Sequence, residues 1–405
     1  MIYQYPLKTP IDVDRLKKSE GQPMFPIKNF YSFHKDANIN YQLNRFLIPE
    51  MEDAFAEIGR QIETLDDWKR LFLAKANSFE SKGEIAYAME LFRAAEFFMS
   101  PDDPDKMIAS ERFVNSFYQG KSGQNFERIA VPYEAGHLHG FKLTPHKLAK
   151  GMVIIHGGFD SYIEDLYLIG KAICESCYEV VMFNGPGQGS TLMREKIPMT
   201  PNWEKPVSAV PDYFNANNVT LIGMSLGGFL AIRAASLEPR VKRVIAYDVM
   251  LDFFACVTSR RGKLAELAIK TLVRLRLSFI LNALARIMIK RDMYSRWGIT
   301  QGMHVMACKT PYEFFSNLQL YNGYSVSGNV EGDVLIMAGA EDHFVPLKQY
   351  SEQLKLLTRA RSVSGRIFIR EEHAQSHCQV GNLGIAVDHI VGWIDEHTIL
   401  SDCLK

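Results

Sequence analysis

Neither sign of charge is in excess in this sequence. Lysine and arginine together number 46, and aspartate and glutamate also number 46, so the formal net charge is zero. Domains that bind nucleic acid usually carry a basic surplus that matches the phosphate backbone. We therefore expect no nucleic-acid partner.

Long hydrophobic runs are missing as well. No stretch of about eighteen uncharged apolar residues occurs, and a transmembrane helix needs roughly that length. The first six residues contain no basic segment followed by an apolar one, so no secretory signal peptide is expected. These absences favour a cytoplasmic protein without stable membrane insertion.

Cysteine is sparse and scattered. The six cysteines are Cys174, Cys177, Cys256, Cys308, Cys378 and Cys403. Such spacing in a large chain indicates reduced thiols rather than a disulfide framework. Cys174 and Cys177 form one C-x-x-C pair, but they fall at a predicted helix without a second pair, so we interpret them as packing residues. No group of residues has metal-ligand spacing, and we expect neither a metal nor a cofactor.

One short motif dominates what is present. Aliphatic and β-branched residues at 219–222 lead into a G-x-S-x-G motif centred on Ser225, and a helical pattern begins at Phe229. This order predicts a nucleophile elbow, a sharp strand-to-helix turn that presents the serine hydroxyl. Side chains in place of Gly223 and Gly227 would collide with the neighbouring strand and helix. The alternative is a glycine turn that holds a serine by chance, and the flanking strand and helix favour the catalytic interpretation.

Two histidines compete for the role of base to this serine. In such a topology the base comes from the loop between the last strand and the C-terminal helix. His373 and His377 both fall in that loop, and we choose His377 because it is nearer the helix predicted from about Gly384. His373 is then an ordinary loop residue.

Three carboxylates are candidates for the acid that orients the histidine. Asp342 and Glu341 directly follow a predicted strand, and Asp342 is our choice. Glu341 is interpreted as a solvated or supporting neighbour. Asp248, at the end of the preceding strand, is held in reserve. The nucleophile, acid and base thus follow one another along the chain.

Backbone donors for an oxyanion are predicted at two turns. One is the N–H of Leu226, directly after the nucleophile. The other comes from the HGG sequence that begins at His156, where we favour the N–H of Phe159 and keep Gly158 as the alternative. His156 itself is expected to brace this loop.

Buried strands alternate with helices over most of the chain. The strands are predicted at residues 128–134, 137–144, 151–155, 179–183, 219–222, 241–248, 333–337 and 366–369. This alternation predicts a mainly parallel, doubly wound sheet of the α/β class. A glycine-rich turn at residues 185–190 has the wrong spacing for a dinucleotide-binding loop, so we interpret it as a strand-end turn near the mouth of the site.

Helical blocks stand before this pattern and within it. Residues 1–125 are predicted to form an N-terminal helical domain, residues 126–249 and 332–405 the catalytic core, and residues 250–331 a helical cap insertion. The N-terminal helices are predicted at residues 38–61, 66–78, 83–99 and 105–118. The stretch 264–288 combines apolar residues with arginines and is predicted as a helix. We interpret it as a lid or packing helix, with a membrane-surface helix as the alternative.

Together these motifs resemble the α/β-hydrolase superfamily. The resemblance rests on the HGG turn at His156, the elbow around Ser225, the G-x-x-D segment ending at Asp342 and the His-Cys pair at His377, in that order. The layout is similar to a branch that includes fermentation/respiration-switch-like proteins, dihydroxypseudooxynicotine hydrolase and acylaminoacyl-peptidase-like hydrolases. That resemblance implies an N-terminal helical domain lying over the active site. The sequence has no propeller-type domain, which argues against a true oligopeptidase.

The expected activity is that of a serine hydrolase. It would cleave an acyl bond, ester or amide, of a small to medium substrate or a short acyl-peptide through an acyl-enzyme. A carbon–carbon hydrolase that acts on a ketone uses the same residues and stays open. A non-catalytic binding module that keeps the fold stays open too, as does a homodimer.

Overall fold

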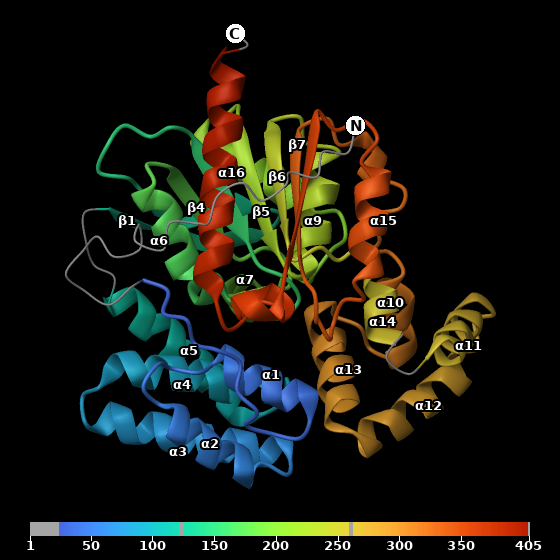
Figure 1. Ribbon diagram of the computed structural model, residues 1–405. Coiled ribbons are helices and arrows are strands. Elements are labelled where there is room, and N and C mark those ends of the chain that lie inside the picture. Colours follow the sequence, from blue (N-terminus) through green and yellow to red (C-terminus); the bar gives the residue numbers. More distant parts are fainter. Residues whose placement is uncertain (1–23, 121–124, 259–261, 404–405) are drawn as a thin grey trace.

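One twisted sheet lies at the centre of the protein (Figure 1). The computed structural model describes residues 24–120, 125–258 and 262–403. The strands are β1 (Phe126–Tyr133), β2 (Gly136–Leu143), β3 (Met152–His156), β4 (Glu179–Phe183), β5 (Val219–Met224), β6 (Val241–Tyr247), β7 (Asp333–Gly339) and β8 (Ser362–Phe368). They form an eight-stranded sheet in the order β1-β2-β4-β3-β5-β6-β7-β8.

The pairing confirms the prediction of a mainly parallel sheet. β1 and β2 form an antiparallel hairpin, and β2 also pairs antiparallel with β4. From β4 through β8 every neighbouring pair is parallel. The carboxyl ends of these strands therefore meet at one edge of the sheet, which is where a doubly wound fold places its site.

Helices cover both faces of the sheet. They are α6 (Tyr167–Glu175), α7 (Gly189–Glu195), α8 (Glu204–Phe214), α9 (Leu226–Ala235), α15 (Lys348–Leu356) and α16 (Leu383–Cys403). On β3, Val153 and Ile155 pack in the layer that holds α6 and α16, whereas Ile154 packs in the layer that holds α8 and α9. Because side chains alternate along a strand, a strand covered on both faces must be apolar throughout, as the sequence indicated.

The N-terminal helices form a separate block below the sheet in Figure 1. They are α1 (Ala37–Arg45), α2 (Glu52–Gln61), α3 (Leu65–Ser81), α4 (Ile85–Phe97) and α5 (Pro104–Gly120). Their own core contains the fully buried Trp68, Phe72 and Phe92. Thr64 starts α3 with a capping box that includes Asp67. The block faces the carboxyl ends of the strands, so it contributes to the site.

The insertion between β6 and β7 consists of helices. It comprises α10 (Phe253–Thr258), α11 (Lys263–Arg274), α12 (Ser278–Arg291), α13 (Met293–Val305) and α14 (Pro311–Leu318). Trp297 of α13 packs against Phe97 and donates its indole N–H to the Phe97 carbonyl at 3.0 Å. The insertion therefore contacts the N-terminal block directly. The predicted boundary at residue 125 adjoins residues 121–124, which lie outside the described part of the chain.

Two helices predicted as continuous are each broken in two. The helix expected at 38–61 stops at Arg45 and restarts at Glu52, because Pro49 disfavours helix before it and Glu50 takes a left-handed backbone (φ 72°). The helix expected at 264–288 breaks between α11 and α12, where Arg276 is left-handed (φ 57°). No glycine or proline marks this second break, so the sequence contained no signal for it.

Several other boundaries differ from prediction by a few residues, among them those of β8 and of the helix after the elbow. β8 begins at Ser362 rather than at residue 366, because it is an edge strand whose first residues are small or polar and only half-buried. The helix after the elbow begins at Leu226 rather than at Phe229. The earlier start brings the helix N-terminus directly against Ser225.

Candidate active site

The turn at Ser225 is held in a backbone conformation that few residues adopt. Its φ is 62° and its ψ is −125°. A Cβ on Gly223 would lie 1.9 Å from the carbonyl oxygen of Gly227, so only glycine fits there. The N–H of Ser225 donates to the carbonyl of Tyr247 at 2.7 Å and ties the turn to β6. These contacts fix the direction of the serine side chain toward the strand ends.

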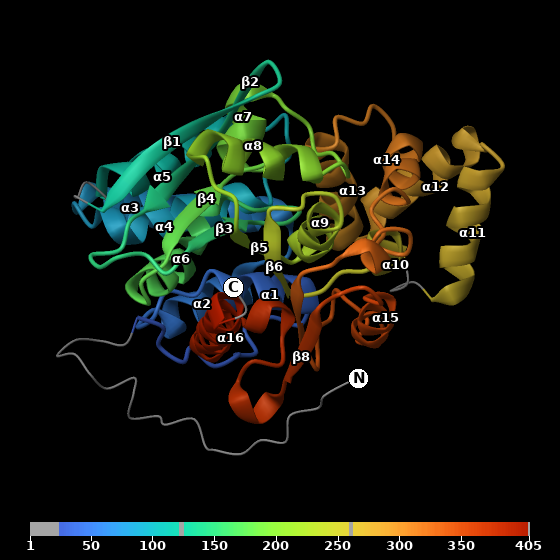
Figure 2. The ribbon, with the colours of Figure 1, turned by 90° about the horizontal axis from the view of Figure 1, so that it is seen from above.

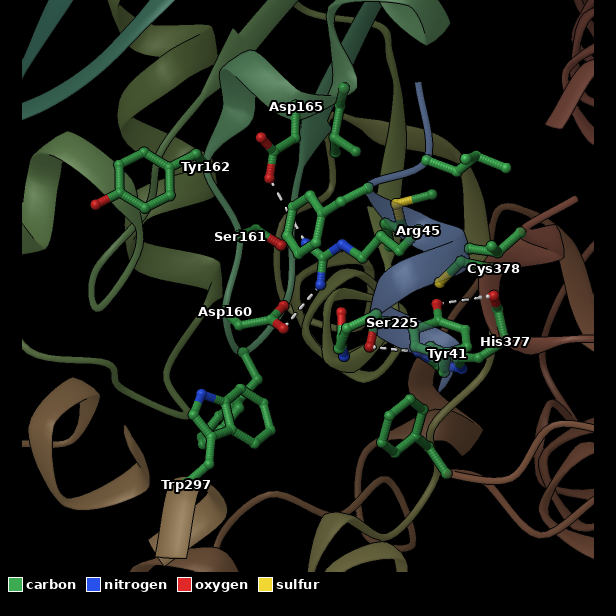
Figure 3. Close-up of a pocket in the computed structure, with 18 of the residues that line it drawn as sticks. Tyr41, Arg45, Asp160, Ser161, Tyr162, Asp165, Ser225, Trp297, His377 and Cys378 are labelled. Atoms are coloured by element: carbon green, nitrogen blue, oxygen red, sulfur yellow. Dashed lines mark hydrogen bonds and ion pairs between the residues drawn. The ribbon is translucent and has the colours of Figure 1, made fainter. Parts of the chain in front are cut away.

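His377 lies next to this serine. Its Nε2 is 2.8 Å from the Oγ of Ser225 (Figure 3). Its Nδ1 is 2.5 Å from Oδ2 of Asp342. The three side chains come from the loops after β5, β7 and β8. The structure therefore brings together the three residues that the sequence selected as nucleophile, acid and base.

Backbone groups aim the Asp342 carboxylate. Its Oδ1 accepts hydrogen bonds from the N–H groups of Phe344 and Val345, at 2.7 and 3.0 Å. Oδ2 is left to face Nδ1 of His377. A carboxylate fixed in this way holds the imidazole in the tautomer that presents Nε2 to the serine.

Asp248, the reserve acid, lies on the same side of the histidine. Its Oδ2 is 3.6 Å from Nδ1 of His377, farther than that of Asp342. Its oxygens instead accept from the N–H of Cys378 at 2.7 Å and from Nε2 of Gln379 at 3.0 Å. Asp248 thus anchors the loop that carries His377. Burial raises the pKa of Asp248 to about 7, although the His377 charge opposes this shift.

The histidine is buried, yet its charged form is favoured. Burial is the largest single influence and disfavours the imidazolium, but the Asp342 carboxylate and Cys378 together outweigh it and raise the pKa of His377 well above its usual range. A base with a carboxylate behind it accepts a proton more readily than free imidazole does. The site therefore has the electrostatics of a serine activated by its neighbour.

The alternative base and the alternative acid both lie at the surface. His373 is exposed on the surface of the same loop. Glu341 points away and pairs with Arg370 at the surface.

Five of the six cysteines are free thiols, as predicted, and the side chain of Cys403 lies outside the described part.

The HGG turn lies against the elbow. A Cβ on Gly158 would be 2.9 Å from the backbone nitrogen of Leu226, so this turn and the start of α9 are in direct contact. The N–H of Gly158 already donates to Oγ of Ser161 at 2.7 Å. Phe159 lines the cavity next to Ser225. Of the two candidates for the second oxyanion donor, this geometry favours Phe159.

Gln188 supports the same turn, although no sequence motif singled it out. Its Nε2 donates to the carbonyls of Gly157 and Gly158, both at 2.8 Å. It belongs to the glycine-rich turn after β4, which the structure places next to the site. His156 is completely buried beside Gly157, and burial lowers its pKa to about 4. A neutral, buried ring here packs behind the loop, and within the described residues its hydrogen bond goes to the carbonyl of Gly157 and not to Ser225.

A cavity of about 880 Å³ opens in front of Ser225. The loops after the strands, the N-terminal helices and the insertion all line it, and apolar side chains make up most of its wall. Among them are Phe46, Met89, Met250, Phe253, Trp297, Ile299 and Phe344. This volume lies at the upper end of the range for pockets that bind drug-sized molecules.

Polar residues of the N-terminal helices also enter the cavity. The hydroxyl of Tyr41 donates to the carbonyl of His377 at 3.0 Å. Arg45 pairs with Asp160 at 2.9 Å and with Asp165 at 3.5 Å (Figure 3). Tyr41 and Arg45 are four residues apart on α1 and so share one face. No motif marks them, because their role depends on contacts with residues far along the chain.

One group of buried residues has the atoms of a metal site. Within the described ranges, Asp248, His377 and Cys378 place ligand-type atoms within 4.8 Å of one another. The Asp248 oxygens and His377 Nδ1 already have hydrogen-bond partners in the protein. A metal would displace them, so we assign this group to hydrogen bonding within the site.

Across residues 24–120, 125–258 and 262–403, no helix combines the length and apolarity that crossing a membrane requires.

No family model matches the chain.

Curated relatives cover most of the sequence. The chain is 28% identical over 400 residues to the 20-hydroxy-prefusarin hydrolase FUS2 of Gibberella moniliformis, with 84% of this chain and 92% of that protein covered. It is 27% identical over 363 residues to hydrolase acrC of Aspergillus aculeatus, with 80% and 83% covered. Both relatives carry the name hydrolase, which supports hydrolase activity for this chain.

Solved structures share the fold. The 2,6-dihydroxy-pseudo-oxynicotine hydrolase superposes with a TM-score of 0.58 at 17% identity, covering 91% of this chain and 95% of that one. Wild-type AbyA5 superposes with a TM-score of 0.63 at 15% identity, covering 85% and 89%. Identities this low speak for the fold alone.

Proposed function

For this chain, which has the α/β-hydrolase fold, we propose the function of a serine hydrolase that cleaves an acyl bond. The observation that carries the proposal is the unbroken chain of contacts from Oγ of Ser225 through His377 to Asp342, at 2.8 and 2.5 Å. This is the geometry of an activated serine nucleophile.

The reaction follows from these positions. Ser225 Oγ attacks the substrate carbonyl carbon while its proton passes to Nε2 of His377, and Asp342 stabilises the imidazolium through Nδ1. His377 then gives the proton to the leaving group as the tetrahedral intermediate collapses to an acyl-enzyme. Water attacks the acyl-enzyme with His377 as base, which releases the acid and restores Ser225.

The oxyanion is assigned to two backbone donors. The N–H of Leu226 lies at the start of α9, whose dipole favours negative charge at that end. The N–H of Phe159 is the second donor, on the turn that Gln188 supports. Donors held rigidly before the reaction stabilise the transition state without reorganising.

The cavity indicates the substrate class. Its volume and apolar wall fit a medium-sized organic molecule with one reactive carbonyl. The relative named 20-hydroxy-prefusarin hydrolase has a small-molecule name, which favours such a substrate over a peptide. The same residues can also cleave a carbon–carbon bond next to a ketone, and a substrate screen separates the two reactions.

The test is labelling with a fluorophosphonate probe, which reacts with an activated serine. We expect wild-type protein to label, and Ser225→Ala and His377→Ala to lose labelling. Ser351→Ala, at an exposed serine on α15, is the matched control and should label fully. Thermal unfolding of Ser225→Ala should match the wild type, because a serine on a turn contributes little to the core.

Either result directs the next step. Labelling justifies a screen of p-nitrophenyl esters, acyl-amino-acid amides and β-diketones. Turnover of β-diketones alone would replace the acyl-bond assignment with carbon–carbon cleavage. A folded wild-type protein that does not label, also after mild treatment that opens the cavity, would contradict the proposal and favour a non-catalytic binding module.

A further inference from the structure

The hairpin formed by α11 and α12 carries an apolar surface that the described chain leaves uncovered. Its exposed apolar side chains are Leu264, Leu267, Leu275, Leu277, Phe279, Ile280, Leu284 and Ile287. Leu264 is 84% exposed and Phe279 is 85% exposed. Single exposed hydrophobic residues are ordinary, but a group of this size on one hairpin marks an interaction surface.

Helical spacing separates the two sides of the hairpin. Ile280, Leu284 and Ile287 are four and three residues apart, so they lie on one face of α12. Leu281 and Ala285 each lie one residue further along, about 100° round the helix, and that adjoining face is buried in the main core. Figures 1 and 2 both show α11 at the outer edge of the molecule, away from the sheet and from the N-terminal helices. The apolar face is therefore accessible.

Basic residues accompany this apolar face. The exposed cations of the hairpin are Lys263, Lys270, Arg274, Arg276, Arg286, Lys290 and Arg291. Glu266 is the acidic residue between positions 263 and 291, so seven cations against one acid leave a net charge of +6. The whole chain has a net charge of zero, which makes this local surplus a property of the hairpin.

We propose that this hairpin docks on the surface of an anionic lipid bilayer. An apolar face accompanied by lysine and arginine is the composition of helices that lie in a membrane interface, with the apolar side chains at the acyl boundary and the cations at lipid phosphates. A second copy of this chain fits the surface poorly, because a symmetric contact would bring two strongly positive hairpins together. A bilayer with anionic headgroups supplies the opposite charge.

The dimensions suit a helix that lies on the membrane. α12 has 14 residues, which span about 21 Å and fall short of a hydrocarbon core of about 30 Å. Ile269 of α11 and Met288 of α12 line the cavity in front of Ser225. The hairpin thus has one side on the cavity and the other on the proposed bilayer, so an apolar substrate dissolved in the membrane lies close to the site.

The experiment is flotation of the full chain with vesicles. Wild-type protein should float with mixed phosphatidylglycerol–phosphatidylcholine vesicles and much less with pure phosphatidylcholine, and high salt should weaken the binding. The variant Leu264→Ser/Phe279→Ser should lose binding by tenfold or more. The variant Arg274→Glu/Arg286→Glu should do the same on anionic vesicles, because each reversal removes one favourable charge and adds a repelling one.

Matched controls come from the loop between β2 and β3. Leu148 is 95% exposed, and Lys147 beside it is also exposed. Leu148→Ser and Lys147→Glu should float as the wild type does. Ser225→Ala should also float normally, so docking is measured independently of the proposed hydrolase activity.

The outcomes are separable. Loss of flotation in both hairpin variants, with normal thermal unfolding and normal controls, supports bilayer docking. Absence of flotation by the wild type overturns it, as does flotation that the hairpin variants leave unchanged. A dimer seen by light scattering that Leu264→Ser/Phe279→Ser dissociates, together with no vesicle binding, also overturns it and assigns the face to a second copy.

Discussion

The two sides of the cavity hold their residues by different means. On the sheet side, Ser225, Asp342 and His377 each follow a strand within a short loop, and nearby backbone groups fix their directions. On the side of the N-terminal helices, Arg45 is held by carboxylates of Asp160 and Asp165, more than a hundred residues along the chain. The sheet side depends on local backbone geometry, and the helix side depends on pairing between distant charges.

Buried charge continues behind Arg45. Arg93 is almost completely buried and pairs with Asp165 at 3.0 Å and with Glu96 at 2.9 Å. Lys106 contacts the other oxygen of Glu96 at 2.5 Å. Buried ion pairs tolerate the loss of one partner poorly, because the remaining charge stays desolvated. Changes on the helix side should therefore affect stability first, and changes on the sheet side should affect chemistry first.

The sharpest test on the sheet side compares the two acids beside His377. Asp342→Asn should lower kcat by roughly three to four orders of magnitude, because the amide no longer holds the correct tautomer. Asp248→Asn should lower it by only about tenfold, since Asp248 is farther and anchors the loop. Steady-state kinetics on a substrate from the screen measures both.

The pH dependence of the rate tests the role of Asp342 in a second way. The Asp342 carboxylate raises the pKa of His377, so Asp342→Asn should move the acidic limb of the rate profile to lower pH. Equal losses in the two variants, or an unmoved limb, would break the assignment of Asp342 as the orienting acid.

Arg93→Met tests the helix side. Removing the guanidinium leaves Asp165 and Glu96 without their shared partner, and we expect a loss of about 3–5 kcal/mol in the free energy of unfolding. Chemical denaturation measures this loss. Arg112→Met is the matched control, because Arg112 pairs with Glu80 at the half-exposed surface and should change stability by less than about 1 kcal/mol. Similar losses of stability in both variants would contradict the claim that the buried charges of the N-terminal helices matter more than a surface ion pair.

The pH dependence of stability tests the loop behind the oxyanion turn. Burial lowers the pKa of His156 to about 4, whereas the unfolded chain protonates near 6.5. As the pH falls from about 6.5 to 4, the unfolded state binds the proton first, so the free energy of unfolding should drop by about 3 kcal/mol from this residue. Above pH 6.5 the residue contributes no pH dependence.

Denaturation of His156→Gln at pH 7 and pH 4.5 measures this contribution, and the variant should lose less stability on acidification than the wild type. His389→Gln is the companion, because burial also lowers the pKa of His389 to about 4 on α16, away from the cavity. His389→Gln should also lose less stability than the wild type between pH 7 and pH 4.5, and its kcat should be unchanged. An unchanged acid response in His156→Gln would show that His156 is not a buried neutral base.

The smallest effect is expected where the two sides meet. Tyr41→Phe keeps the ring against Phe344 and His343 but removes the hydroxyl that donates to the carbonyl of His377. We expect kcat to fall by about tenfold and the free energy of unfolding to fall by about 1 kcal/mol, because the buried carbonyl of His377 loses its donor. Tyr31→Phe, on the segment before α1, should leave the rate unchanged. A Tyr41→Phe enzyme with wild-type kcat would separate the helix side from the chemistry.

Local signals in the sequence located some features of the molecule and missed others. Every strand was located, and Ser225, Asp342 and His377 were selected, because apolar runs and turn residues are local signals. The breaks between α1 and α2 and between α11 and α12 were missed. The second break has no glycine or proline and lies at the left-handed backbone of Arg276.

By itself, the sequence determined the strands, the mainly parallel class of the sheet and the turn that carries Ser225, since apolar runs, their alternation with helices and turn residues can be read along the chain. Only the tertiary structure decided that Asp342 rather than Asp248 lies closest to His377. It alone placed Tyr41 and Arg45 in the cavity and left the α11–α12 surface uncovered. Those outcomes depend on contacts between segments far apart in the chain, whose pairing no local pattern encodes.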